Sequence, residues 1–159
     1  MLAHQFAIIP MNSDKSIIMS NMEFISIDDT IINYIGDSLK WIYSTWNGHE
    51  VKSGLSYYGF SIIQNDELLK FLNIIKQWRN LFYHSPEEFY ITGGYLPENA
   101  QYEKILIKKV DLINKLDALI LLCKKAKLQK SCILHNGILF IFVAIALIDH
   151  NLFTSDSQM

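Results

Sequence analysis

The sequence predicts a single α+β domain in which two amphipathic helices lie on one face of an antiparallel sheet. Three features predict it: two long stretches with apolar residues at helical spacing, several short stretches rich in β-branched and aromatic residues, and glycine-containing turns between them. The 159 residues suffice for one ordinary domain with one core. Half of the residues are apolar and 19% are charged, which is typical of a folded chain rather than a disordered one.

The N-terminal part is expected to hold a peripheral segment followed by a helix. Residues 1–21 contain two short apolar pieces separated by polar residues, and we expect the domain itself to span residues 22–138. Asp28 and Asp29 would be favourable in the first turn of a helix. Apolar residues then recur at helical spacing, at Ile31, Ile35, Leu39, Ile42 and Trp46.

The next two elements are a strand and a long helix. Residues 55–64 (LSYYGFSIIQ) are rich in aromatic and β-branched residues and predict a strand. Asn65 is the expected N-cap of the helix, which should end near Ser85 and Pro86 because the residue before a proline avoids helical geometry. The apolar stripe of this helix comprises Leu68, Phe71, Leu72, Ile75, Trp78 and Phe82.

A hairpin, a second helix and a last strand complete the prediction. Residues 87–96 and 102–109 are the expected hairpin strands, joined by the turn-forming sequence PENAQ. A second apolar stripe predicts a helix that ends after lysine-rich turns, and residues 131–138 predict a final strand. From residue 55 to residue 138 the order is strand, helix, strand, strand, helix, strand, which is the ferredoxin-like split βαβ order.

Residues 139–159 form an apolar segment with a polar tail. The uninterrupted apolar run from Ile138 to Ile148 is well short of the ~20 residues that a membrane-spanning helix needs. We therefore expect a buried strand or helix there, and a membrane-associated accessory protein stays as an alternative. The start of the chain lacks the basic and apolar regions of a signal peptide, which favours the cytoplasm.

Composition argues against several functions. Arg79 is the single arginine and the net charge is -2, which makes nucleic acid an improbable partner. The histidines are scattered without the spacing of metal ligands, so no metal site and no cofactor are expected. The two cysteines, Cys123 and Cys132, are too few for a disulfide framework and are expected to be buried thiols.

One short motif suggests catalysis. The residues from Arg79 to His84 (RNLFYH) resemble the R-N-x-x-x-H motif of HEPN ribonucleases. That resemblance implies a histidine acting on the ribose hydroxyl or leaving group and an arginine stabilising phosphate charge. HEPN domains are helical bundles, whereas strands are predicted on both sides of this motif, so a helix C-terminus is the preferred interpretation and a ribonuclease is the alternative.

The hairpin is the candidate partner-binding surface. Acidic and aromatic residues gather on it, and tyrosines anchor protein interfaces while carboxylates steer association. The candidate residues are Glu87, Glu88, Tyr90, Tyr95, Glu98, Tyr102 and Glu103. The alternative interpretation of these residues is an ordinary solvated surface.

Several segments together resemble small bacterial immunity proteins of polymorphic toxin systems. They are WIYSTW (41–46), GLSYYGF (54–60), KQWRNLF (76–82), PEEFYITGG (86–94) and LHNGI (134–138). The resemblance implies a cytoplasmic protein that neutralises one toxin by direct binding, with no catalytic residues and no cofactor of its own. It supplies no motif from which binding residues can be assigned.

Overall fold

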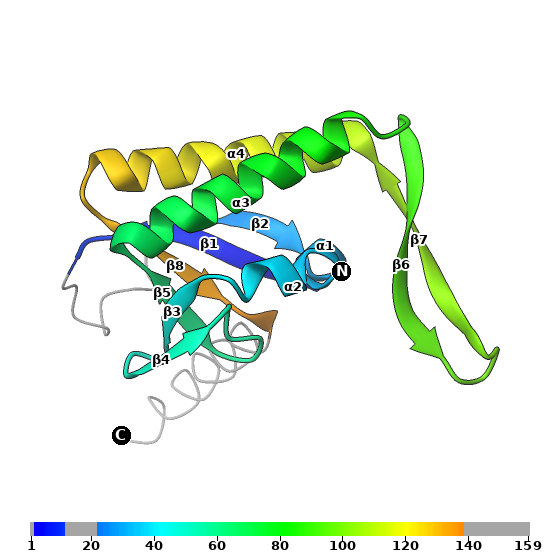
Figure 1. Cartoon of the computed structure of the whole chain (residues 1–159), viewed down its shortest axis with the longest axis horizontal. Coiled ribbons are helices and arrows are strands. Elements are labelled where there is room, and N and C mark those ends of the chain that lie inside the picture. The colour runs from blue at the N-terminus through cyan, green and yellow to red at the C-terminus, as the bar shows by residue number, and fades with distance from the viewer. Residues whose placement is uncertain (1, 12–21, 139–159) are drawn as a thin grey trace, which may run out of the picture.

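The computed structural model describes residues 2–11 and 22–138 and shows an α+β fold (Figure 1). A six-stranded antiparallel sheet carries two main helices, and a two-stranded hairpin extends from one end. In chain order the elements are β1 (Ala3–Ile9), β2 (Ile25–Asp28), α1 (Asp29–Tyr34), α2 (Gly36–Leu39), β3 (Tyr43–Trp46), β4 (Glu50–Ser53), β5 (Phe60–Ile63), α3 (Asn65–Tyr83), β6 (Glu88–Leu96), β7 (Gln101–Lys108), α4 (Lys109–Leu128) and β8 (Cys132–Asn136).

The strand order in the large sheet is β2-β1-β8-β5-β3-β4. Strand β8 pairs with β1 on one side, where His135 lies opposite Phe6, and with β5 on the other. Strand β1 also pairs with β2, so it has a neighbour on each side. Residues 3–9 thus lie inside the sheet, which differs from the peripheral position expected for residues 1–21.

Both faces of the central strands are covered. On one face Phe6 and Ile133 join the main core under the helices. Side chains alternate along a strand, so the neighbouring residues point the other way. There Ile9, Cys132 and Leu134 form a smaller apolar cluster. This double burial explains why every residue of β8 is buried.

The two main helices confirm their sequence predictions. They lie side by side on one face of the sheet, and α4 crosses β1 and β2 (Figure 1). Helix α3 begins at Asn65, so this residue is the first helical residue and not the expected cap. The buried residues of the helices are Leu68, Phe71, Leu72, Ile75 and Phe82 of α3, and Leu112, Leu116, Leu119, Ile120, Cys123 and Ala126 of α4.

The continuous N-terminal helix expected from residue 27 onward is wrong. The segment forms β2, the short helices α1 and α2, and β3. Ile31, Ile35, Leu39 and Ile42 are all buried, so the apolar pattern identified core residues but not their secondary structure. The helix breaks at Ile35 and Gly36, where a β-branched residue and a glycine adjoin, and both types disfavour helix.

The hairpin is confirmed, but its expected place in the main sheet is wrong. Strands β6 and β7 pair only with each other and form a separate two-stranded sheet. The ferredoxin-like order is therefore kept along the chain without giving a ferredoxin-like sheet. In Figure 1 the hairpin projects from the end of the molecule where α3 ends and α4 begins.

No helix in residues 2–11 and 22–138 is long and apolar enough to cross a membrane. Except for Ile138, the apolar run proposed as a membrane anchor lies outside the described residues.

Candidate functional site

The outer face of the hairpin carries two exposed pairs of large side chains, with the hydrogen-bonded pair Thr92 and Lys104 between them. Tyr90 lies opposite Leu106, and Tyr95 lies opposite Tyr102. Both pairs are on the same face, because residues 102 and 106 are an even number of positions apart on β7. Their exposed fractions are 65% and 47% in the first pair, and 54% and 58% in the second. We call Tyr90, Tyr95, Tyr102 and Leu106 the tyrosine face.

A bulge keeps the two tyrosine pairs aligned. The register shifts between Thr92 and Tyr95, so β6 contains one more residue than β7 there. Gly93 lies in this bulge and turns toward the inner face. A Cβ on Gly93 would lie 2.6 Å from Ile105 and 2.9 Å from the carboxylate of Glu103. A side chain at this position would therefore displace its cross-strand neighbours.

The inner face of the hairpin base is anchored in the domain core. Ile91 is 3% exposed and belongs to the main apolar cluster, while Phe89, Ile105 and Ile107 pack against that cluster. The Phe89 ring lies 5.9 Å from the Phe82 ring at the end of α3. At its base, the hairpin thus has one face packed on the core and one exposed face.

The acidic candidates do not form one continuous surface. Glu88 lies opposite Lys108, and Glu87 lies 3.5 Å from the Lys109 ammonium. Glu103 is on the inner face, away from the tyrosine face. Glu98 is exposed in the turn between the strands. Of the seven predicted residues, the structure places the three tyrosines and Glu88 on the outer face, while the other carboxylates lie elsewhere.

The arginine and histidine of the ribonuclease-like motif are engaged separately. The Arg79 guanidinium donates two hydrogen bonds to the Asp117 carboxylate on α4, at 2.8 and 3.1 Å, and lies over the Tyr83 ring. His84 follows the last residue of α3 and is exposed, with its ring beside that of Tyr83. Arg79 therefore joins the two helices through an ion pair.

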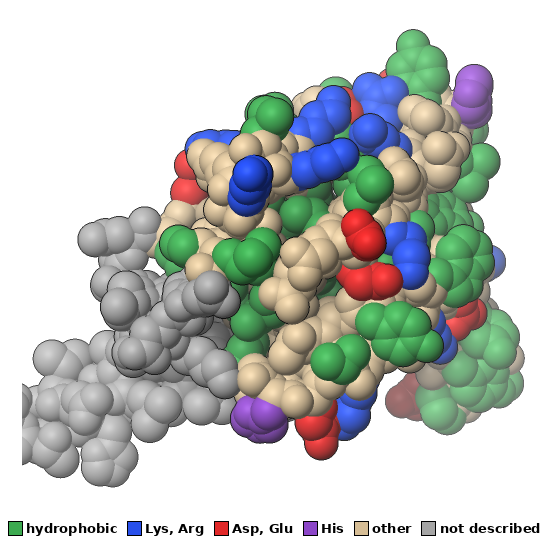
Figure 2. Space-filling model, turned by 60° about the vertical axis from the view of Figure 1, so that its left-hand side comes forward, with side chains coloured by type: hydrophobic (Ala, Val, Ile, Leu, Met, Phe, Trp, Pro, Cys, Tyr) green, Lys and Arg blue, Asp and Glu red, His purple; other side chains and the backbone are tan. Residues whose placement is uncertain are grey.

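Basic side chains gather over the helical layer, at the top of the view in Figure 2. The lysines in and just after the last turns of α4 are all exposed: Lys124, Lys125, Lys127 and Lys130. They complement the negative end of the helix dipole and are typical of a solvated helix end.

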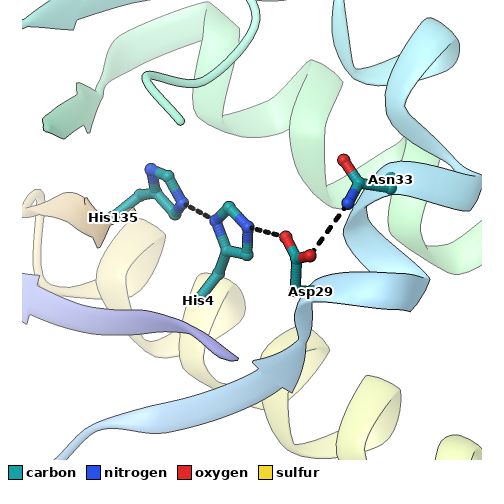
Figure 3. Close-up of polar contacts among 4 residues, drawn as sticks. All are labelled: His4, Asp29, Asn33 and His135. Atoms are coloured by element: carbon teal, nitrogen blue, oxygen red, sulfur yellow. Dashed lines mark hydrogen bonds and ion pairs between the residues drawn. The ribbon is translucent and has the colours of Figure 1, made fainter. Parts of the chain in front are cut away.

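A cluster of polar side chains that the sequence did not predict is buried at one end of the main sheet. His4 of β1 and His135 of β8 are 1% and 0% exposed, and their Nδ1 and Nε2 atoms are 2.8 Å apart (Figure 3). His4 Nε2 lies 3.0 Å from Asp29 Oδ1, and the Asn33 amide donates to the other oxygen of that carboxylate. We call His4, His135 and Asp29 the histidine chain.

Burial shapes the protonation of this chain. It lowers the pKa of His4, and the hydrogen bond with Asp29 opposes the shift. It lowers the pKa of His135 well below its ordinary value, and His4 adds to that shift. Both imidazoles are therefore neutral at pH 7. Since His135 has no exposed surface, it is not placed to act on a substrate.

Metal binding finds no support in the described part of the chain. No group of three or more histidine, cysteine, aspartate or glutamate side chains is arranged there to hold an ion.

A signal for the histidine chain was present in the sequence. His4 and His135 each lie within a short apolar strand, but 131 positions separate them, and only the pairing of β1 with β8 brings them together.

No protein family model, no curated protein and no solved structure matches this chain.

Proposed function

We propose that this chain is a non-catalytic protein-binding module and that the tyrosine face of the β6–β7 hairpin contacts its partner. The observation that carries the proposal is the two-sided character of the hairpin. Ile91 on the inner face is 3% exposed, whereas Tyr90, next to it in sequence, is 65% exposed. The core thus fixes the hairpin in place while its large outward side chains remain available.

Physical chemistry favours a protein as the ligand of such a surface. An isolated two-stranded hairpin is marginally stable in water, so a hairpin that extends beyond its core contacts gains from a partner. Tyrosine supplies a large contact area and a hydroxyl at a low cost in side-chain entropy, and it is enriched at the centres of interfaces. A projecting ridge is unlike the concave pockets that hold small molecules.

The partner class that we propose is a bacterial toxin, as the resemblance to immunity proteins implies. Such a protein would act in the cytoplasm by covering the active site or substrate path of the toxin, which requires a surface but no cofactor. Because Glu87 and Glu88 face lysines, we propose that the tyrosines rather than the carboxylates supply most of the binding energy.

The test is native mass spectrometry of the tagged protein purified from its own host, with bound proteins identified in the same sample. The expected result is a stoichiometric complex with a second protein. In the variant Tyr90→Ser/Tyr95→Ser/Tyr102→Ser the fraction of protein found in the complex should fall strongly, while the circular dichroism spectrum stays unchanged.

The matched control makes the same tyrosine-to-serine substitution elsewhere on the surface. Tyr43 and Tyr58 are 56% and 66% exposed and lie outside the hairpin, so Tyr43→Ser/Tyr58→Ser should retain the partner. A wild-type protein without a protein partner would contradict the proposal. RNA cleavage that requires both Arg79 and His84 would instead favour the ribonuclease alternative.

A further inference from the structure

The histidine chain joins strands that are distant in sequence. His4 and His135 project from β1 and β8 toward the helix-covered face, beside Phe6. Their ring centroids are 5.0 Å apart and their ring planes differ by 15°. With a nitrogen-to-nitrogen distance of 2.8 Å, this geometry is that of a hydrogen bond lying in the plane of both rings.

The contacts assign one tautomer to each neutral ring. The Asp29 carboxylate can only accept, so His4 carries its proton on Nε2 and offers the lone pair of Nδ1. His135 must then donate from Nε2, which leaves its Nδ1 without a proton. That Nδ1 atom is buried and has no hydrogen-bond partner within the described residues.

An added proton has no satisfactory place in this arrangement. A charged His4 would donate from both nitrogens, so His135 would have to accept at Nε2 and move its own proton to Nδ1. The new N–H at Nδ1 would then be buried without an acceptor, which is costly in a dry interior. If His135 kept its proton on Nε2 instead, two N–H groups would face each other at 2.8 Å.

The surrounding charges offer the extra proton little compensation. Asp29 of α1 is the carboxylate that contacts the chain, and Tyr57 packs its ring edge against His4. Four further charged groups belong to neighbouring elements, and they form two ion pairs. Asp37 of α2 and Lys40, the residue after α2, line the same pocket of about 350 Å³ as His4 but pair with each other at 2.8 Å.

The helices bring no second carboxylate to the rings. Lys115 of α4 pairs with Asp28 at 2.8 Å. On α3, Phe71 packs against Phe6, the neighbour of His135. Asp29 therefore remains the one carboxylate in contact with the pair among the described residues.

We propose that the histidine chain is an acid-sensitive contact that holds β1 and β8 together, so that separation of these strands is linked to the uptake of protons. Above the ordinary pKa of histidine the neutral pair joins the strands. In more acidic solution, the histidines of the separated strands bind protons, and this shifts the equilibrium toward the open form of the sheet.

The sign follows from the two protonation equilibria. The ordinary histidine pKa is 6.5, and burial lowers the pKa of both residues in the closed protein. Below pH 6.5 the open form thus binds more protons than the closed form. The stabilising contribution is complete above pH 6.5 and is lost as the pH falls toward the closed-state values. Each linked proton changes the opening equilibrium about tenfold per pH unit.

The experiment is amide hydrogen exchange of the whole chain between about pH 7.5 and about pH 5, expressed as protection factors corrected for the intrinsic rate. Amides of residues 3–9 and 132–136 should show constant protection above pH 6.5. Below it, their protection should fall by up to about tenfold per pH unit for each linked proton. Protection in both segments that is independent of pH would overturn the proposal.

Variants separate the buried pair from other titrating groups. His135→Leu and His4→Gln should abolish the acid-dependent loss of protection in these segments. His49 and His84 are exposed, so His49→Gln and His84→Gln should retain it. If strand protection depends on acid in the same way in wild type and in the buried-pair variants, the proposal is also refuted.

Ring-nitrogen NMR of the wild-type protein tests the proposal even where a buried-pair variant fails to fold. The His135 resonances of the closed form should remain those of a neutral ring protonated at Nε2 throughout the acid range. Titration of His135 near its ordinary pKa, with strand protection unchanged, would contradict the proposal.

Discussion

The substitution Ile91→Ala tests whether the core fixes the hairpin. Ile91 is 3% exposed and belongs to the main apolar cluster, so nearly all of its side chain is removed from water. Alanine lacks three of its carbon atoms, and at about 0.8 kcal/mol for each buried carbon the transfer loss is about 2.4 kcal/mol. An incompletely filled cavity raises the expected loss of unfolding free energy to about 3 kcal/mol.

The assay is equilibrium urea denaturation, followed by circular dichroism and by tryptophan fluorescence. The matched control is Tyr90→Ala, because this neighbour on the same strand is 65% exposed and its replacement should change stability by less than about 0.5 kcal/mol. Equal effects of the two substitutions would refute the reasoning, since the hairpin would then have no buried anchor in the core.

Three further predictions concern packing, a thiol and an ion pair. A Cβ on Gly137 would lie 2.2 Å from the Tyr57 carbonyl oxygen, so Gly137→Ala should lower the unfolding free energy by about 2–4 kcal/mol in urea denaturation. Gly36→Ala meets nothing within 4 Å and should be neutral or slightly stabilising, and equal losses would refute the clash. Burial raises the pKa of Cys123 to about 12, so at pH 8 iodoacetamide should label it only as fast as the protein opens, and rapid labelling of the folded protein would contradict this burial. Asp117→Asn should lower stability slightly in low salt and have no effect in high salt, since its pair with Arg79 is partly exposed, whereas a salt-independent loss would indicate another role.

The sequence predicts the long helices because each buries one continuous stripe. Their apolar residues recur every three or four positions over five turns, which no strand reproduces. The segment around α1 and α2 has the same spacing but divides it among four short elements. Periodicity identified Ile31 and Ile35 as core residues, whereas the secondary structure also depends on the pairing of β2 with β1.

Long-range pairing sets the features that the sequence did not predict. Alternating residues and a turn were enough to predict the two hairpin strands. No local feature of the sequence shows that these strands pair only with each other and not with the main sheet. The turn between β3 and β4 does have a local signal, because an Asn-Gly pair is typical of a tight hairpin turn and Asn47 and Gly48 both have positive φ there. Tyr90, Tyr95 and Tyr102 were identifiable because they lie beside acidic residues in the predicted hairpin.

The most direct test of the proposed function is the affinity of the purified protein for the partner found with it, measured by calorimetry. Replacing the three tyrosines of the tyrosine face with serine should weaken binding on the order of 100-fold, since each would contribute about 1 kcal/mol. The control Tyr43→Ser/Tyr58→Ser should bind like wild type. If all three proteins bind equally well, the tyrosine face is not the binding surface.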